Sequence, residues 1–163
     1  MIVLSVVVAG ASAAATKTVT VYSVATGVQY INTEDDRVRG HVNNPLDPAA
    51  SKLRPKGSPT GKGPFAGDVA IYALSLYTSP TLKKSAGSAV YTCFFNYDQH
   101  AFCKGYFKLK GAGTLVASGP VDFKASQFTI VVTGGTNKYL GVRGQLSSAS
   151  GQAHSKVDFK LIG

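Results

Sequence analysis

The chain has 163 residues, of which 44% are hydrophobic and 15% are charged, and it contains 18 glycines and no tryptophan. A soluble domain usually carries about 25% charged residues, and this low charge with near-neutral hydropathy excludes a disordered chain. No apolar run reaches the roughly 18 residues that a membrane-spanning helix needs. Lys and Arg outnumber Asp and Glu by 17 to 8, and the resulting net charge of +9 favours acidic partners.

The first 15 residues carry no charge and combine an apolar stretch with small residues. This composition is typical of a secretory signal peptide and its cleavage site. We therefore predict a signal peptide at 1–15, a single mature domain at 16–163, and a secreted or extracellular location. An apolar first strand is the alternative interpretation of the same residues.

From Lys17 onward, period-two stretches rich in Val, Thr, Tyr and Phe predict strands separated by Gly, Ser and Pro. The eight predicted strands cover residues 17–25, 66–78, 88–96, 100–110, 113–121, 127–134, 141–149 and 154–162. The strand at 66–78 is apolar on both faces, which indicates burial against the interior on one side and against a second subunit on the other. We therefore expect a homo-oligomer, either a dimer or a trimer. A long loop at about 32–64 holds five of the seven prolines, and a short strand is expected within it near 37–42.

Two cysteines bracket a predicted hairpin whose tip lies at 97–99. Pairing residue 94 with 102 and 95 with 101 places Cys93 opposite Cys103, at a separation that suits a disulfide. Two thiols do not complete a zinc site, and the three histidines lack the spacing of metal ligands. We therefore expect a disulfide, no metal and no cofactor.

The most specific local feature is the segment Val132–Gln145, with the sequence VTGGTNKYLGVRGQ. It resembles the TGGTGxYxGARG segment of dirigent proteins and of the related allene oxide cyclases, with Asn137 in place of a glycine and Val142 in place of an alanine. Upstream, Ala117–Phe123 resembles the strand end of the same family that carries Gly-Pro. The resemblance covers about 66–162 and implies an all-β fold, the eight-stranded antiparallel β-barrel of the allene oxide cyclase/dirigent type, often trimeric.

Dirigent proteins steer the coupling of phenoxy radicals, and allene oxide cyclases fold a reactive epoxide so that it cyclises. The resemblance therefore implies a barrel that positions a small hydrophobic or phenolic molecule in its interior, without a covalent nucleophile. The cysteines do not match those of plant dirigent proteins, and the acidic residue of their first strand has no counterpart at 19–24. These departures indicate a distant, secreted microbial member.

Arg143 matches the arginine of the resembled segment and shares a predicted strand face with Gln145 and Ser147. If this polar face lines the barrel, Arg143 binds a carboxylate or phenolate of the ligand. The alternative is a structural role in which Arg143 pairs with an aspartate at the barrel end. The other candidate ligand-binding residues are three tyrosines and one aspartate near a strand end: Tyr72, Tyr91, Tyr139 and Asp122.

Three lysines alternate with aromatic residues on one face of the strand predicted at 100–110: Lys104, Lys108 and Lys110. Such a face binds polyanions through charge and stacking, and the alternative is a solvated face that protects an exposed strand. Nucleic acid is not an expected partner, because no block of five basic residues occurs.

The function we predict is a secreted, dirigent-like barrel that binds a small hydrophobic or phenolic molecule and steers its coupling or cyclisation. Two alternatives stay open at this point: a non-enzymatic extracellular module that binds anionic polymers, and an envelope or matrix structural protein. If the protein is an enzyme, the resemblance implies a cyclase-like, isomerase-like or coupling-directing activity without a metal or a covalent nucleophile.

Overall fold

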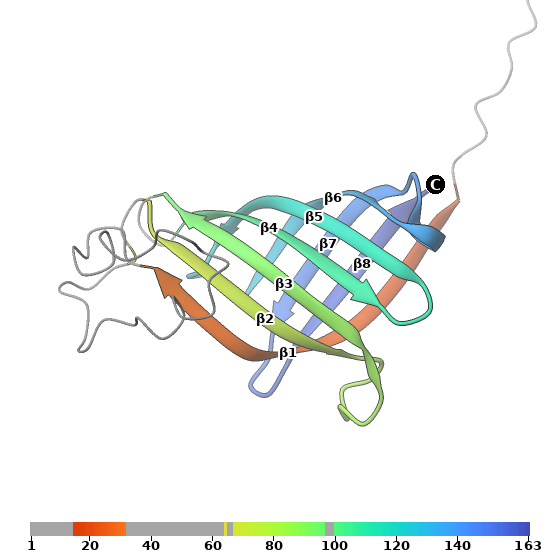
Figure 1. Ribbon diagram of the computed structural model, residues 1–163, viewed down its shortest axis with the longest axis horizontal. Helices are drawn as coiled ribbons and strands as arrows, with labels where there is room; N and C mark the ends of the chain where they lie inside the picture. Colours follow the sequence, from red (N-terminus) through yellow and green to blue (C-terminus); the bar gives the residue numbers. More distant parts are fainter. Residues whose placement is uncertain (1–14, 32–63, 65–66, 97–99) are drawn as a thin grey trace, which may run out of the picture.

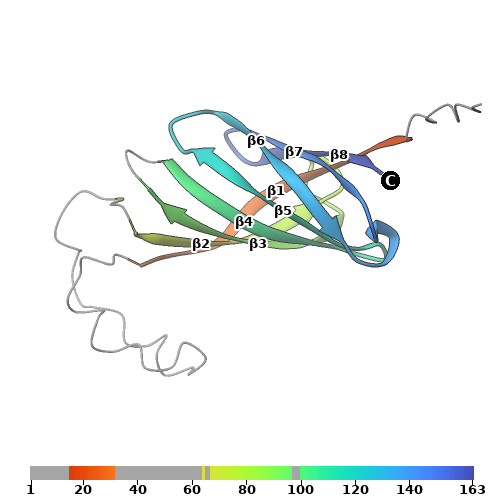
Figure 2. The same ribbon diagram turned by 90° about the horizontal axis from the view of Figure 1, so that it is seen from above.

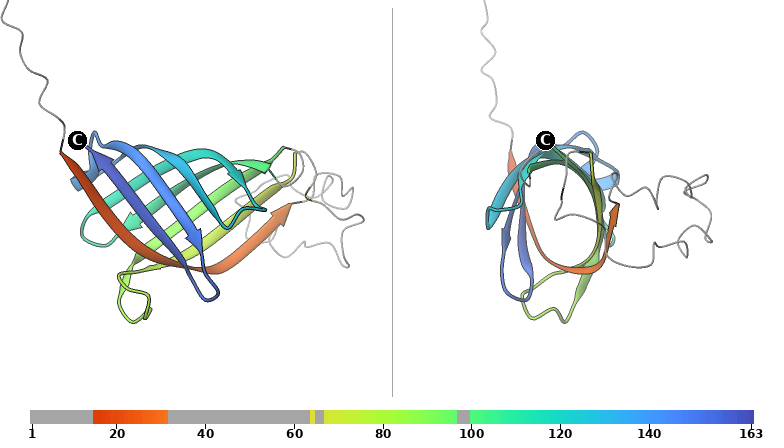
Figure 3. Two further views of the ribbon diagram at one scale, coloured as in Figure 1. Left: turned by 180° about the vertical axis from the view of Figure 1, so that it is seen from behind. Right: turned by 90° about the vertical axis from the view of Figure 1, so that its left-hand side faces the viewer.

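The computed structural model describes residues 15–31, 64, 67–96 and 100–163. Eight antiparallel strands form a closed barrel in which each strand pairs with the next and β8 pairs with β1, as the end-on view shows (Figures 1 and 3). The strands are β1 (Thr16–Ile31), β2 (Val69–Tyr77), β3 (Ser85–Phe95), β4 (His100–Leu109), β5 (Gly113–Asp122), β6 (Gln127–Gly135), β7 (Arg143–Ser150) and β8 (Ser155–Ile162). The predicted all-β, eight-stranded antiparallel barrel is confirmed.

In the regular stretches of the strands, side chains alternate between the barrel interior and the outer surface. In β4 every second residue is buried, so that Phe107 points inward and the lysines point outward. In β8 the buried residues are Val157, Phe159 and Leu161, which is the face that the sequence predicts. Burial of these apolar side chains stabilises the fold by roughly 1.5–3 kcal/mol each.

An aromatic stack forms the centre of the core. The ring of Phe107 lies 4.9 Å from that of Phe159 and 5.2 Å from that of Tyr91, both in edge-to-face geometry. Tyr91 pairs with Gly105 across the β3–β4 ladder, and the absence of a side chain at Gly105 leaves room for the tyrosine ring. Edge-to-face pairs contribute about 0.5–1.5 kcal/mol each beyond the area that they bury.

The predicted hairpin and disulfide are confirmed. Cys93 pairs with Cys103 in the β3–β4 register, and their sulfur atoms lie 2.07 Å apart. The two residues are almost fully buried on the inner face of the barrel. The disulfide therefore contributes to the interior surface.

The first strand is longer than predicted. It continues to Ile31, past the predicted end at residue 25, through a register shift between Ala25 and Gly27. A bulge of this kind increases the local twist, and Gly27 weakens the alternation that predicts a strand. Residues 1–14 of the predicted signal peptide, the predicted strand at 37–42 and most of the long loop lie outside the described residues. Within the described residues, no helix is long and apolar enough to cross a membrane.

The two ends of the barrel differ. We call the mouth the end at which β1, β3, β5 and β7 finish, and the closed end the opposite one, where the start of β1 and the C-terminus lie side by side (Figures 1 and 2). At the closed end the 3-10 turn η2 (Asn137–Tyr139) buries Tyr139 against Gly135. A methyl group at Gly135 would lie 2.6 Å from the Cβ atom of Tyr139, so this glycine of the resembled segment permits the close approach.

Candidate ligand-binding site

A cavity of about 240 Å³ opens into the barrel interior near the mouth. Aromatic rings from β2, β3 and both sides of the β5–β6 connection line it: Tyr72, Tyr91, Phe123 and Phe128. Four serine hydroxyls come from the adjacent strands β1, β7 and β8: Ser23, Ser148, Ser150 and Ser155. The disulfide, Leu74, Val121 and Ile130 complete the lining, which contains no charged side chain.

Strand register brings three of the serines together. Ser155 pairs with Ser23 on one side and with Ser150 on the other, so the three hydroxyls form a row across three strands. Ser148 lies on the same inner face, opposite Val157. Among the described residues, none of the four hydroxyls forms a hydrogen bond with another protein group. No fully enclosed polar side-chain atom of these residues lacks a partner, so the four hydroxyls keep some accessible surface. The serine hydroxyls therefore face the cavity, where a ligand or water accepts or donates their hydrogen bonds.

The two tyrosines of the cavity are phenols held in the neutral state. Burial raises the pKa of Tyr91 well above its usual range, and burial also raises the pKa of Tyr72. The ring of Tyr72 stacks on Phe123 with 6.1 Å between centroids. Because both phenols stay protonated near neutral pH, they are hydrogen-bond donors to a ligand rather than bases.

The cavity lies where β5 and β6 separate. Their ladder ends at the pair Ser118–Val131, before Pro120, which has no N–H to donate. Beyond this point Val121 of β5 and Ile130 of β6 both line the cavity. The Gly-Pro segment noted in the sequence is thus where the pairing of β5 with β6 ends, beside the cavity.

Aromatic contacts also cross the mouth. The ring of Phe95 lies 5.2 Å from Phe123 and 6.4 Å from Tyr30. The hydroxyl of Tyr30 donates to Asp68, whose side chain is fully buried just before β2. This Tyr30–Asp68 pair does not belong to the cavity lining, but it fixes the rim next to it.

Of the candidates taken from the sequence, Tyr72 and Tyr91 line the cavity and the others do not. Arg143 lies on the outer face and donates to the carbonyl oxygen of Thr133 at 3.1 Å. The condition on which ligand binding by Arg143 depended, a polar face that lines the barrel, is not met: Leu146 and Ser148 of β7 alternate inward, so Arg143 points outward. Neither does it pair with an aspartate of the described residues: its guanidinium donates to the backbone carbonyls of Thr133 and Val142.

Tyr139 and Asp122 occupy structural positions outside the cavity lining. Tyr139 lies at the closed end, where burial raises its pKa. The carboxylate of Asp122 accepts the backbone N–H of Lys124 at 2.8 Å and lies 3.8 Å from the imidazole of His100. Asp122 therefore caps the turn that follows β5.

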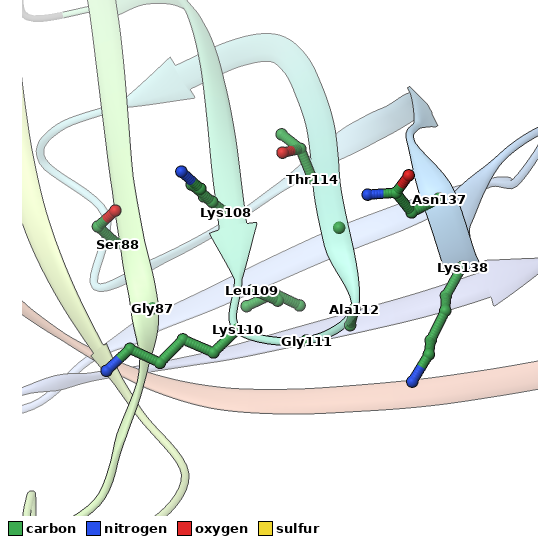
Figure 4. A pocket seen from close by; sticks show the side chains of 11 residues that line it. Gly87, Ser88, Lys108, Leu109, Lys110, Gly111, Ala112, Thr114, Asn137 and Lys138 are labelled. Carbon is green, nitrogen blue, oxygen red and sulfur yellow. The ribbon is translucent and has the colours of Figure 1, made fainter.

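The three candidate lysines point outward, as the alternation predicts. Lys104 and Lys108 lie on the outer face of β4, and Lys110 lies in the turn that follows it. The latter two line a second, larger hollow at the closed end, outside the barrel (Figure 4). The site that sequence reasoning missed is the serine row, because its members lie far apart in the chain and only the register of β1, β7 and β8 brings them together.

No protein-family model matches the chain, and no curated protein matches it. Solved structures do match its fold. A pyocyanin demethylase is 21% identical, with a TM-score of 0.65 over 89% of this chain and 99% of that one. A pterocarpan synthase dirigent protein is 16% identical, with a TM-score of 0.57 over 90% of this chain and 93% of that one.

A third match is a nonspecific heme-binding cyclase that catalyses a 4+2 cycloaddition in neoabyssomicin biosynthesis; it is 13% identical, with a TM-score of 0.58 over 90% of this chain and 64% of that one. At these identities the likeness concerns the fold. The chain has the barrel fold of dirigent proteins and of cyclases, and the resemblance drawn from its sequence is confirmed at that level.

Proposed function

We propose that this barrel binds a small, neutral, aromatic molecule in its interior cavity and steers the coupling or cyclisation of that molecule. The observation that carries the proposal is the cavity lining: four aromatic rings, a row of serine hydroxyls and no charged group. An uncharged interior binds a charged ligand poorly, because the ligand would lose its hydration without gaining an ion pair. Phenols and other neutral aromatic compounds meet no such penalty.

The cavity size limits the ligand. A cavity of about 150 Å³ holds benzene, so a space of about 240 Å³ accommodates one or two rings. Larger ligands extend through the mouth, where Phe95 and Phe123 offer further ring contacts.

The lining suggests how the protein contributes to a reaction. Stacking on Tyr72 and Phe128 fixes the plane of a ring, and hydroxyl donors at Tyr91 and the serines fix its rotation within that plane. Holding a reactive intermediate in one conformation lowers the entropy lost on the way to the transition state. Structures named as a demethylase, a dirigent protein and a cyclase share this fold and support the proposal that such a barrel hosts a reaction of a small molecule.

The proposal is tested by titrating neutral phenols, their methyl ethers and their carboxylate analogues, with binding followed by calorimetry and native mass spectrometry. We expect phenols to bind, carboxylates to bind at least tenfold more weakly, and Tyr91→Phe to weaken phenol binding about fivefold, since one hydrogen bond contributes roughly 1 kcal/mol. Tyr77→Phe is the matched control, because Tyr77 lies on the outer face of β2. Equal binding of phenol and carboxylate, or equal effects of the two substitutions, would refute the interior site.

Secretion is part of the proposal. A disulfide forms and persists in oxidising compartments, which supports an extracellular location. Expression of the full chain in a secreting host tests it: we expect the exported protein to begin near Ala14 to Thr16. Retention of residues 1–15 on an intracellular protein would contradict it.

A further inference from the structure

The closed end of the barrel carries a hollow that the proposed function does not use. Its volume is about 750 Å³, and three lysines border it: Lys108 at the end of β4, Lys110 in the β4–β5 turn and Lys138 in η2 (Figure 4). Ser88, Thr114 and Asn137 add two hydroxyls and an amide to the lining (Figure 4). We call this set of residues the lysine hollow.

No acidic side chain of the described residues borders the lysine hollow. Three acidic side chains occur among the described residues. Asp68 and Asp122 lie at the mouth, and Asp158 is engaged on β8 by Lys156 at 2.8 Å and by Thr20 at 2.6 Å. Within this part of the chain, none of the three ammonium groups of the hollow forms an ion pair or a hydrogen bond.

The backbone around the hollow is rigidly held. The N–H of Lys110 donates to Ala86 at 2.9 Å, and the N–H of Lys138 donates to Ala112 at 3.0 Å. These two bonds tie the β4–β5 turn to β3 and to η2. Gly111 lies in the left-handed region with φ of 67°, and a side chain there would point into open space, so the glycine turn keeps the hollow clear. Two of the three lysines are therefore anchored through hydrogen-bonded backbone.

We propose that the lysine hollow binds an anionic polysaccharide, that is, a hydroxyl-rich chain that carries sulfate or phosphate groups. Three unpaired ammonium groups around one concave surface attract several anionic groups at once. Ser88, Thr114 and Asn137 supply the neutral donors and acceptors that sugar hydroxyls require.

The composition of the hollow favours a glycan over single-stranded nucleic acid. Proteins bind unpaired bases by stacking them on aromatic rings. The lining of the hollow consists of glycine, serine, lysine, leucine, alanine, threonine and asparagine, without an aromatic residue. The hollow therefore offers charge and hydrogen bonds but no platform for a base.

The test compares two triple variants of the full-length protein on heparin and on dextran sulfate, at about 0.15 M salt. The first carries Lys108→Gln, Lys110→Gln and Lys138→Gln. The matched control carries Lys83→Gln, Lys84→Gln and Lys160→Gln, which remove the same charge from exposed positions that do not border the hollow. Thermal unfolding of both variants checks that they fold.

We expect the wild type to bind both polymers, the first variant to bind roughly 10- to 100-fold more weakly, and the control to stay within about threefold of the wild type. Replacing the three hollow lysines by arginine keeps the charge and should preserve binding. The proposal is overturned if the two glutamine variants weaken equally, if the wild type does not bind, or if a single-stranded oligonucleotide of equal charge binds more tightly than heparin. Because the hollow and the interior cavity lie at opposite ends of the barrel, phenol binding should be unchanged in the first variant.

Discussion

Adding one methyl group at Gly105 tests the link between the core and the interior cavity. Gly105 is buried on the inner face of β4 opposite Tyr91. A Cβ atom there would lie 2.3 Å from Cδ1 of Tyr91 and 2.9 Å from the carbonyl oxygen of Val90. Carbon atoms in ordinary contact are about 3.5–4.0 Å apart, so Gly105→Ala forces the Tyr91 ring to move by about 1 Å. Phe107 packs edge-to-face against this ring at 5.2 Å, and the free direction is the cavity.

The cost of this displacement is that of overpacking a core, about 1–3 kcal/mol. For a domain of this size, each kcal/mol lowers the melting temperature by about 2–4 °C, so we expect a decrease of roughly 4–8 °C for a loss near 2 kcal/mol. A displaced Tyr91 ring also occupies part of the ligand space. Phenol binding should therefore weaken together with stability.

The measurement is denaturant unfolding of Gly105→Ala in the wild-type background and in a Tyr91→Ala background. Without the ring, part of the cost disappears, and only the contact with the Val90 carbonyl remains. Gly27→Ala is the control, because a Cβ atom at Gly27 meets Ala73 at an ordinary 3.7 Å. The reasoning is refuted if Gly105→Ala costs as little as the control, or costs the same with and without the Tyr91 ring.

Three further predictions concern the disulfide, one surface ion pair and self-association. Reduction of the Cys93–Cys103 disulfide should lower the free energy of unfolding by about 2–3 kcal/mol, measured by urea denaturation with and without a thiol reductant; no difference would contradict a stabilising role. Hydrogen bonds from Lys156 and Thr20 lower the pKa of Asp158, so its contribution is present above the ordinary pKa of about 4 and is lost as the pH falls through the depressed value. Asp158→Asn should accordingly lower stability by about 0.2–1 kcal/mol at pH 7 and by nothing in strong acid, as melting curves at both pH values will show; a constant difference would exclude the ion pair as its cause. The protein should run as a dimer or trimer in light scattering, and Phe94→Asp, whose 52% exposed side chain lies on the outer face of β3 beside Val69 of β2, should yield monomers; a monomeric wild type would contradict the expected homo-oligomer.

The fold was predictable from the sequence because a barrel strand has a strong local signature. Alternation of apolar and polar residues depends on nearest neighbours, so β4 and β8 are evident from their own residues. The disulfide follows from one short hairpin for the same reason. The end of β1 was not predictable, since the bulge near Gly27 interrupts the local pattern and the pairing with β2 overrides it.

The site was predictable only in part. Tyr72 and Tyr91 lie on strands whose inner face is evident, whereas Ser23 and Ser155 face inward on strands where serine resembles a turn or solvent residue. Their proximity depends on register between distant strands, which no local pattern encodes. Arg143 shows the converse. Its polar strand face beside the glycine segment predicted a ligand site, but this face points outward. The apolar face forms the interior, because an unpaired guanidinium is costly to bury.

The distribution of charge over the barrel connects these findings. In the part of the chain that the structure describes, the cationic side chains lie on the outer surface and the cavity lining is neutral, so the low charge content reflects a chain in which every second strand residue faces a low-dielectric interior. The polar groups of such an interior are neutral phenols and hydroxyls, which can form hydrogen bonds with a ligand. They ionise too weakly to act as strong acids or bases. In the function proposed above, the reactivity therefore belongs to the bound molecule, and the protein selects among its conformations. Three of the outer cationic side chains border the concave surface at the far end, where we propose that an anionic polysaccharide binds.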